Sequence, residues 1–311
     1  MVLSLGYLWH TVAVVMIKLV LFLLSLSLLL VVAGLIAFLF VLTPADRTLL
    51  LSSKQSIDVA GDKRTYSLQN QSSDASQPLV IALHGFRDRS AWMAAYSGLH
   101  ILAEEEGFTL ALPDGKRQSW NGLFCCGWSF INQTDDIAFI QAMIDDIDAN
   151  YTIDRQNIFV LGFSNGGVLA QKLLAERPEL FAAGASLMSG VGNQETQLDI
   201  SNATAPLLLI NGTDDSYVPL QEFDDTNNDF QFMPAYQTAD IWAEHYGLTD
   251  KTQEDTPEFT RFRWQNDANR QLEQHIYDTT HRWPDWRLWR FPRDVPSATV
   301  DIWDFFAHHR R

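Results

Sequence analysis

Short apolar runs separated by helical stretches dominate the chain after residue 78. The runs are four to seven residues long and rich in branched and aromatic side chains, which is typical of strands buried in a parallel sheet. They occupy residues 78–84, 109–112, 158–163 and 207–210. Helices are predicted between them, over residues 91–106, 135–151 and 168–177. This alternation predicts a mostly parallel sheet covered by helices on both faces.

Two further segments have strand character. Residues 56–68 alternate polar and apolar positions about a Gly-Asp turn, which predicts a hairpin at an edge of the sheet. Residues 272–277 are predicted to form a later strand, and the polar residues 70–77 a loop. The sequence shows no internal repeat, low-complexity region or second domain boundary, so residues 44–311 are predicted to form one domain.

The first 43 residues differ from the rest. Residues 19–42 form a run of 24 residues without a charged side chain. A helix of that length, at about 1.5 Å per residue, exceeds a hydrocarbon core of roughly 30 Å. A cleaved signal peptide is the alternative, but its apolar region is usually only about 7 to 15 residues long. Residues 1–43 are therefore predicted to be a signal anchor with a transmembrane helix.

The charges beside this span predict its orientation. Lys18 and the amino terminus precede it, whereas Asp46 and Arg47 follow it, so the positive-inside rule places the amino terminus in the cytoplasm. The domain would then be extracytoplasmic, either periplasmic or extracellular. The apolar residues 2–17 leave open a two-span hairpin, which would reverse the orientation, and cleavage of the segment would make the domain a secreted protein.

Charge is distributed unevenly along the chain. All 38 acidic residues but only 21 of the 22 basic ones follow residue 43, which gives that part a net charge of −17. Nucleic acid and anionic lipid surfaces are therefore poor partners. Aspartate pairs occur at 135–136, 145–146, 214–215 and 224–225. Because no Cys/His cluster or EF-hand spacing accompanies them, most are predicted to be solvated or to begin helices, and no metal site is predicted.

The clearest candidate for chemistry follows the third apolar run. Gly162-Phe163-Ser164-Asn165-Gly166 lies between a predicted strand and a predicted helix, so Ser164 occupies the apex of a sharp turn. A serine on such a turn has a strained backbone, and the residues two before and two after it must be small. Gly162 and Gly166 meet that requirement. Because the G-x-S-x-G pattern alone also occurs by chance, a nucleophilic Ser164 requires partners elsewhere in the chain.

A carboxylate and a histidine that could act with Ser164 come later. Asp214 and Asp215 both follow the fourth predicted strand, at the sheet edge where functional groups collect, and position alone does not separate them. A turn aspartate that binds backbone amides is the alternative for either. Of the eight histidines, His281 lies in a loop after the last predicted strand and completes the order serine, acid, histidine.

These residues belong to a longer series of recognisable segments. The segments are L-H-G at 83–85, S-W-N-G with C-C-G within 119–127, D-D-I-A-F-I at 135–140, I-D-R-Q-N-I-F-V-L-G-F-S-N-G-G at 153–167, N-G-T-D-D-S-Y-V-P at 211–219, H-R-W-P at 281–284 and I-W-D-F-F-A at 302–307. In these the chain resembles the polyhydroxybutyrate depolymerase-like esterases, whose relatives include feruloyl and acetyl xylan esterases. The match covers nearly all of the chain after about residue 78, in the expected order.

The resemblance implies an α/β-hydrolase fold for residues 44–311 and selects among the candidates. The family's acid usually stands in G-T-x-D-x-x-V-P, which favours Asp215, and its histidine is usually followed by one residue and then Trp-Pro, as His281 is. Two stretches depart from the family pattern. These are the charged residues 87–90 and the acidic residues 221–232, which are expected to border the site and so to bear on substrate identity.

The implied chemistry is ester hydrolysis by a Ser164–His281–Asp215 triad. His281 would accept the serine proton, Asp215 would orient the imidazole, and the backbone N–H groups of Phe86 and Asn165 would stabilise the tetrahedral oxyanion. The expected substrates are carboxylic esters, small or polymeric, such as acetyl, feruloyl or hydroxyalkanoate esters. No metal or organic cofactor is expected, because the protein's own groups complete the mechanism.

Two pairs of residues near these motifs carry further expectations. Cys125 and Cys126 can pair only with each other within the chain, and the resemblance and the extracytoplasmic location favour a disulfide over two buried thiols. Such a disulfide is expected to shape a wall of the pocket. Trp120 and Trp283 could form an aromatic platform for the substrate, although aromatic side chains in a domain this large more often simply pack in its interior.

Two other functions remain open at this stage. A serine peptidase could use the same triad on amides, and comparable activity on an anilide and a nitrophenyl ester would indicate one. A catalytically silent, membrane-tethered binding module is the alternative from a different class. The intact triad and oxyanion residues argue against that module, and failure to react with a fluorophosphonate would support it.

Overall fold

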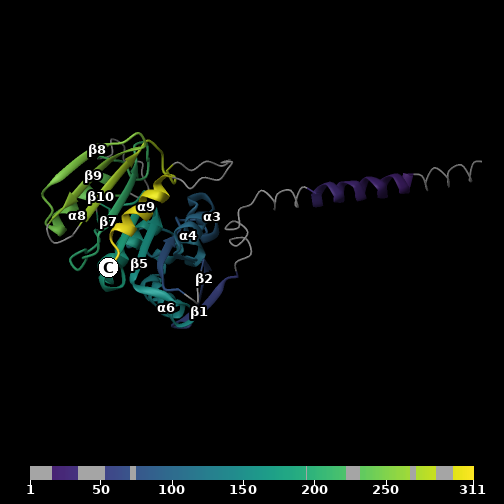
Figure 1. The fold of residues 1–311 in the computed structure, drawn as a ribbon, viewed down its shortest axis with the longest axis horizontal. Coiled ribbons are helices and arrows are strands. Elements are labelled where there is room, and N and C mark those ends of the chain that lie inside the picture. Colours follow the sequence, from purple (N-terminus) through teal and green to yellow (C-terminus); the bar gives the residue numbers. More distant parts are fainter. Residues whose placement is uncertain are drawn as a thin grey trace, which may run out of the picture. The chain divides into compact units, whose positions relative to one another are not determined.

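The computed structural model describes residues 16–33, 53–70, 75–193, 195–221, 232–266, 271–284 and 297–311. The chain divides into two compact units, residues 1–50 and 51–311. The first contains the helix Met16–Ala33, drawn in purple in Figure 1, whose 18 residues are apolar enough to cross a membrane or to serve as a signal sequence. At about 1.5 Å per residue this helix is roughly 27 Å long. Residues 34–42 of the predicted span lie outside the described residues.

The second unit is built on one ten-stranded sheet in the order β1-β2-β4-β3-β5-β6-β7-β10-β9-β8 (Figure 1). Its strands are β1 Gln55–Val59, β2 Asp62–Gln69, β3 Gln77–Leu83, β4 Thr109–Pro113, β5 Ile153–Phe163, β6 Ala183–Leu187, β7 Leu207–Gly212, β8 Lys251–Asp255, β9 Phe259–Gln265 and β10 Gln271–Tyr277. The six strands from β4 to β10 in this order run parallel, and both edges are antiparallel. The predicted mostly parallel sheet and edge hairpin are thus confirmed.

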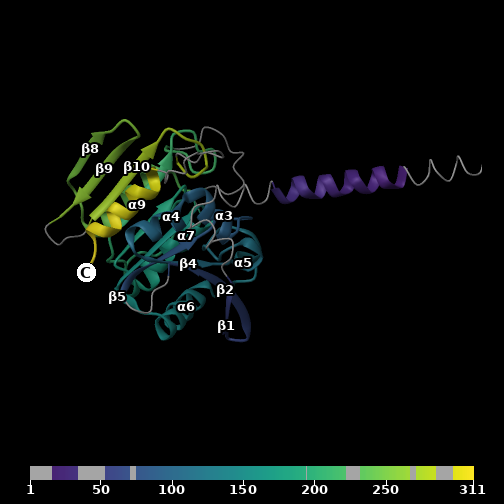
Figure 2. The same cartoon turned by 45° about the vertical axis from the view of Figure 1, so that its right-hand side comes forward.

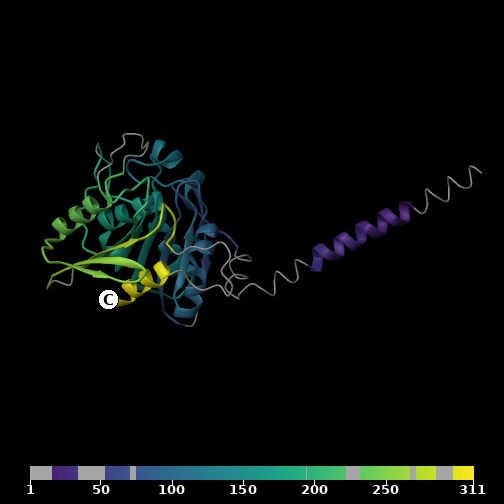
Figure 3. The same cartoon turned by 90° about the horizontal axis from the view of Figure 1, so that it is seen from above.

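Helices cover both faces of the sheet. They are α3 Ser90–Ser97, α4 Leu99–Glu106, α5 Gly127–Ile131, α6 Asp136–Asn150, α7 Asn165–Glu176, α8 Ala235–Tyr246 and α9 Ser297–His308. Apolar side chains of α6, α7 and α8 share one large core with the sheet. Helix α9 packs with α4 on the opposite face, where Figures 2 and 3 show it in yellow.

The helix predicted over residues 91–106 is in fact two helices. Gly98 separates α3 from α4 with a φ of 69°, a left-handed conformation that glycine adopts without steric cost. Its N–H closes the end of α3 by donating to the carbonyl of Ala94 at 3.0 Å. The break turns the chain between the two helices, which pack against each other and against β4.

Candidate active site

Ser164 occupies the turn between β5 and α7, as its sequence motif predicts. Its φ of 53° and ψ of −119° lie outside the regions that side-chain-bearing residues normally adopt. The turn is fixed by backbone hydrogen bonds, in which the Ser164 N–H donates to the Leu187 carbonyl and its own carbonyl accepts from the Gly167 N–H, both at 2.8 Å. Strand β6 therefore holds the strained residue in place from one side, and the helix from the other.

The two glycines of the motif are required by direct backbone contact. A Cβ atom on Gly162 would lie 2.0 Å from the carbonyl oxygen of Gly166. A Cβ atom on Gly166 would lie 2.2 Å from the carbonyl oxygen of Leu83 and 2.6 Å from that of His84. The first helical turn of α7 thus touches both its own strand and the end of β3. The prediction that these positions must be small is confirmed.

His281 and Asp215 complete a chain of hydrogen bonds to the serine. His281 Nε2 lies 2.9 Å from Ser164 Oγ, and Nδ1 lies 2.8 Å from Asp215 Oδ2. The other carboxylate oxygen, Asp215 Oδ1, accepts from the backbone N–H groups of Tyr217 at 2.8 Å and Val218 at 2.9 Å. The Asp215 side chain is fully buried, whereas that of His281 is 17% exposed. This arrangement can move a proton from the serine to the imidazole.

The structure separates the two adjacent aspartates that sequence position left equivalent. Asp215 is buried against His281, whereas Asp214 is exposed to solvent. Both residues still anchor the loop, because the N–H of Asp214 donates to the carbonyl of Thr279 at 3.0 Å. The loop that carries the acid is thereby hydrogen-bonded to the loop that carries His281.

The end of β3 forms the second wall of the site. Asn165 is the first residue of α7, so its backbone N–H has no acceptor within the helix. Phe86 follows β3 by three residues, and the Leu83 and His84 carbonyls contact Gly166 of the same helical turn. The two predicted oxyanion residues are therefore brought to neighbouring segments on one side of Ser164.

His84 fixes the peptide that precedes Phe86, a contact that sequence position gave no reason to expect. Its Nδ1 donates to the Gly85 carbonyl at 2.7 Å, and its Nε2 accepts from the Gly115 N–H at 3.0 Å. Burial lowers the pKa of this imidazole, which keeps it in the neutral form that these two bonds need. Because a carbonyl and the next N–H belong to one planar peptide, His84 also orients the N–H of Phe86.

The side chain of Asn165 ties the nucleophile turn to the cysteine loop. Its Oδ1 accepts from the Trp120 N–H at 2.7 Å, and its Nδ2 donates to the Cys125 carbonyl at 2.7 Å. Cys125 and Cys126 form a disulfide with each other across a cis peptide bond. They lie in a small apolar cluster that includes Val168 of α7. The predicted pairing is present, one helical turn from the serine.

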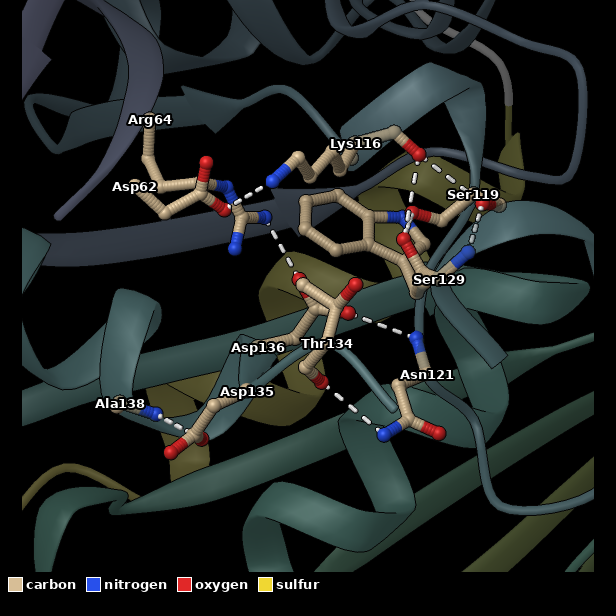
Figure 4. Close-up of polar contacts among 12 residues, drawn as sticks. Asp62, Arg64, Lys116, Ser119, Asn121, Ser129, Thr134, Asp135, Asp136 and Ala138 are labelled. Atoms are coloured by element: carbon tan, nitrogen blue, oxygen red, sulfur yellow. Dashed lines mark hydrogen bonds and ion pairs between the residues drawn. The ribbon is translucent and has the colours of Figure 1, made fainter. Parts of the chain in front are cut away.

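A buried ion pair supports the same loop from the far side (Figure 4). Arg64 Nη2 contacts Asp136 Oδ1 at 2.6 Å, and Asp136 Oδ2 accepts from the Asn121 N–H at 2.7 Å. Burial raises the pKa of Asp136 despite the opposing charge of Arg64. The expectation that most of the aspartates are solvated or begin helices holds for this pair, because Asp135 caps α6 and Asp136 is its first residue. The Asp136 side chain is nevertheless buried. An aspartate next to a long apolar helical run could have been suspected of such burial.

The prediction that two tryptophans form an aromatic platform for the substrate is wrong, because both rings are buried. Trp120 is 0% exposed and Trp283 is 2% exposed. Each indole N–H is used internally, Trp120 donating to the His84 carbonyl at 2.8 Å and Trp283 to Thr299 Oγ1 at 2.9 Å. Both rings therefore pack behind the site and hold its loops, since an indole needs a hydrogen-bond partner when it is buried.

The described residues include no group of three or more His, Cys, Asp or Glu side chains that could hold a metal ion. Of the acidic stretch 221–232, which was expected to border the site, residues 222–231 lie outside the described part of the chain. The other departure, residues 87–90, follows Phe86 as a short loop and ends at Ser90, the first residue of α3.

Solved structures share this architecture. An acetyl xylan esterase from Aspergillus awamori superposes with a TM-score of 0.53 at 18% identity, over 75% of this chain and 95% of that one. An S-formylglutathione hydrolase from Agrobacterium tumefaciens gives a TM-score of 0.53 at 13% identity, over 84% of this chain and 95% of that one. The chain has the α/β-hydrolase fold. At these identities the likeness establishes the fold alone.

Sequence comparisons agree with this fold. The Phospholipase/Carboxylesterase family matches residues 129–241, which include Ser164 and Asp215. NocK of Nocardia uniformis subsp. tsuyamanensis, which carries an esterase name, is 28% identical over 58% of this chain and 52% of its own length. Poly(3-hydroxyalkanoate) depolymerase C of Paucimonas lemoignei is 29% identical over 37% of this chain and 28% of its own.

Feruloyl esterase B of Piromyces equi is 24% identical over 59% of this chain and 35% of its own length. The chain thus spans about half the length of these curated relatives, or less. The resemblance to depolymerase-like, feruloyl and acetyl xylan esterases that the sequence motifs predict is confirmed, and the relatives are carboxylic ester hydrolases.

Proposed function

We propose that this α/β-hydrolase is a serine esterase that cleaves carboxylic esters through an acyl-enzyme on Ser164. The observation that carries the proposal is the continuous hydrogen-bond chain from Ser164 Oγ through His281 to the buried Asp215 carboxylate. A buried carboxylate that accepts two backbone N–H groups and an imidazole is held in one orientation, so it can fix the imidazole tautomer.

The reaction follows from these contacts. Ser164 Oγ attacks the ester carbonyl carbon while His281 Nε2 takes the hydroxyl proton, and Asp215 stabilises the imidazolium through Nδ1–H. The carbonyl oxygen becomes negatively charged and is stabilised by the N–H groups of Phe86 and Asn165. His281 then returns the proton to the departing alcohol. Water, activated by the same imidazole, releases the acid and restores the serine.

The names of the relatives indicate the class of substrate. They include a poly(3-hydroxyalkanoate) depolymerase, a bifunctional acetylxylan esterase/xylanase and several feruloyl esterases. We therefore expect esters of acetic, hydroxycinnamic or hydroxyalkanoic acids, small or polymeric. No cofactor enters the steps above, because the nucleophile, base and oxyanion donors all come from the chain.

The experiment uses the full chain in a mild non-ionic detergent and measures fluorophosphonate labelling and 4-nitrophenyl acetate hydrolysis. Ser164→Ala should lose labelling, and Ser164→Ala and Asp215→Asn should lose on the order of 10⁴ or more in kcat/KM. Asp214→Asn is the matched control and should keep the parent rate within about twofold, because its side chain is exposed. Circular dichroism checks that each variant is folded. Residual activity of Ser164→Ala within tenfold of the parent would contradict the proposal.

The amino-terminal helix supports a second part of the proposal, a signal anchor that keeps the catalytic domain extracytoplasmic. Its 18 residues have a mean hydropathy of 2.7, and the charges that flank the predicted span are consistent with an amino terminus in the cytoplasm. The full chain should stay in the membrane pellet after carbonate washing. Recovery of a shortened, active protein in the soluble fraction would indicate instead that the segment is cleaved.

A further inference from the structure

Two arginines border the oxyanion side of the site. Arg87 directly follows Phe86, and Arg117 lies in the neighbouring loop that begins after β4. We propose that Arg87 and Arg117, called here the arginine rim, bind a carboxylate or similar anionic group on the ester substrate, so that the enzyme prefers negatively charged esters. This inference rests on the proposed esterase function and narrows it to a substrate class.

Aromatic rings place the arginine rim beside the oxyanion loop. The guanidinium carbon of Arg87 lies 5.1 Å from the centre of the Phe86 ring, and that of Arg117 lies 5.2 Å from the Trp128 ring. The two rings are neighbours through Gly127, where an added Cβ would approach Phe86 to 2.4 Å. The rim therefore continues from the predicted oxyanion donor outward. A guanidinium over a ring face keeps its N–H edge available to a ligand.

In the described part of the chain, the rim arginines lack the carboxylate partners that five arginines elsewhere in the domain have. Carboxylates of the protein pair with five arginines elsewhere in the domain, namely Arg64, Arg155, Arg177, Arg261 and Arg263. Within the described ranges, no carboxylate forms an ion pair with Arg87 or Arg117, although the soluble part holds 38 acidic residues. The adjacent Lys116 is already used, since its Nζ contacts Asp62 Oδ2 at 2.5 Å (Figure 4). Two exposed cations thus remain for an external anion.

The backbone that carries the rim is strained. Arg87, Arg117 and Gln118 have φ values of 61°, 49° and 61°, a left-handed region that costs an L-residue about 1–2 kcal/mol. The two loops are joined by a hydrogen bond from the Arg87 N–H to the Gln118 carbonyl at 2.8 Å. Strain of this kind persists only where surrounding contacts enforce it, and it concentrates at ligand-binding positions. The loops hold both arginines in defined positions.

The positive charge of the arginine rim would make the enzyme prefer anionic esters. The soluble part carries a net charge of −17, so its overall field repels an anionic ester. Two unpaired guanidinium groups beside the oxyanion loop reverse that repulsion locally. A guanidinium binds a carboxylate through two parallel N–H···O bonds, which fixes the orientation of the ester as well as its affinity.

The test compares matched esters that differ only in one carboxylate. Mono-4-nitrophenyl adipate and 4-nitrophenyl hexanoate place the charge on the acyl group, and 4-acetoxybenzoate and phenyl acetate place it on the leaving alcohol. In the full chain, the double variant Arg87→Gln/Arg117→Gln should lower kcat/KM for the preferred charged ester by about tenfold, the value of a charged hydrogen bond. The rate on its neutral counterpart should change by less than about twofold. Added salt should reduce the parent's preference for the charged ester, because it screens exposed charges.

Arg155→Gln is the matched control, because it removes the same charge at the amino end of β5, away from Ser164 at the other end. Its exposed ion pairs contribute little to stability, so it should leave the ratio of charged to neutral rates unchanged. Arg87→Lys should retain part of the preference. The proposal is overturned if the double variant keeps the parent's ratio of charged to neutral rates, or if the parent prefers the neutral ester in both pairs. A parent that cleaves neither member of either pair contradicts the esterase proposal itself.

Discussion

The two halves of the candidate active site are held in different ways. On the serine side, Gly162 and Gly166 pack against backbone carbonyls and the Ser164 N–H is bonded to β6, so main-chain contacts set the serine turn itself. On the histidine side, the loop after β10 depends on side chains. Trp283 donates to Thr299 Oγ1, and the Arg282 guanidinium donates to Thr279 Oγ1 at 3.0 Å. One side is fixed by steric exclusion, and the other by polar side-chain contacts.

This difference predicts how each side fails. Backbone contacts do not change with pH or salt, but they tolerate no added atom. Side-chain contacts tolerate substitution better, and those made by ionised carboxylates such as Glu273 respond to protonation. The serine side should therefore be broken by the smallest possible insertion, and the histidine side by acid.

The largest expected effect is that of Gly162→Ala on the serine side. The added methyl carbon would lie 2.0 Å from the Gly166 carbonyl oxygen, and the neighbouring atoms are backbone, which cannot swing away. We expect a loss of more than about 4 kcal/mol in the free energy of unfolding, or no folded protein at all. Urea unfolding followed by tryptophan fluorescence measures it.

Gly61→Ala provides the control for this substitution. Gly61, in the turn between β1 and β2, has a φ of 84° but open space around its Cα. Its replacement should cost only about 1 kcal/mol, from backbone strain without a clash. Equal stabilities of the two alanine variants would show that the contact at Gly162 does not constrain the turn.

Acid should act on the histidine side through Glu273 of β10, the strand that leads to His281. Burial alone would raise the pKa of this carboxyl, but contacts with His275 and Arg263 outweigh it and lower the pKa from its ordinary 4.5 to about 2. Because the folded-state value is the lower one, the stabilisation is complete above pH 4.5 and is lost as the pH falls toward 2. The loss is about 3 kcal/mol in the free energy of unfolding. Urea titrations at pH 5, 4, 3 and 2.5 measure it.

The variant Glu273→Gln distinguishes the contribution of Glu273 to the loss of stability in acid from that of the other carboxylates. The variant should be less stable at pH 7, because Arg263 loses a charged partner at 2.8 Å, and it should show a shallower decline between pH 4.5 and 2. Glu254→Gln, which removes an exposed partner of Arg261, should keep the parent slope. A parent slope in Glu273→Gln would assign the acid sensitivity to other residues.

The same contrast explains what could be predicted from sequence. The serine turn is encoded by adjacent residues, so its strand, apex and glycines were all predicted correctly. Strand β6, Ala183–Leu187, was missed because it is built of small residues. Packing requires small residues in this strand, since a Cβ on Gly184 would approach Leu174 of α7 to 2.5 Å. The strand therefore lacks a recognisable apolar run because α7 packs closely against it.

Features that depend on how segments pack together could not be predicted from the sequence. Strand β8 is exposed along its whole length, and β9 intersperses aromatic with polar and charged residues, so no apolar run marked this hairpin. The aromatic platform failed for a related reason. A tryptophan near a motif looks the same whether its ring faces a ligand or the interior, and only packing places Trp120 and Trp283 inside.

The contact between Gly166 and the end of β3 also has a consequence for how such enzymes diversify. The spacing from nucleophile to oxyanion loop is set by van der Waals contact between a helix and two carbonyl oxygens, those of Leu83 and His84. That contact involves backbone atoms alone, whereas the side chains of His84 and Asn165 hold the loops around it. In the proposed esterase, exposed residues at the edge of the site can therefore be replaced while the distance from Ser164 to the Phe86 loop stays the same.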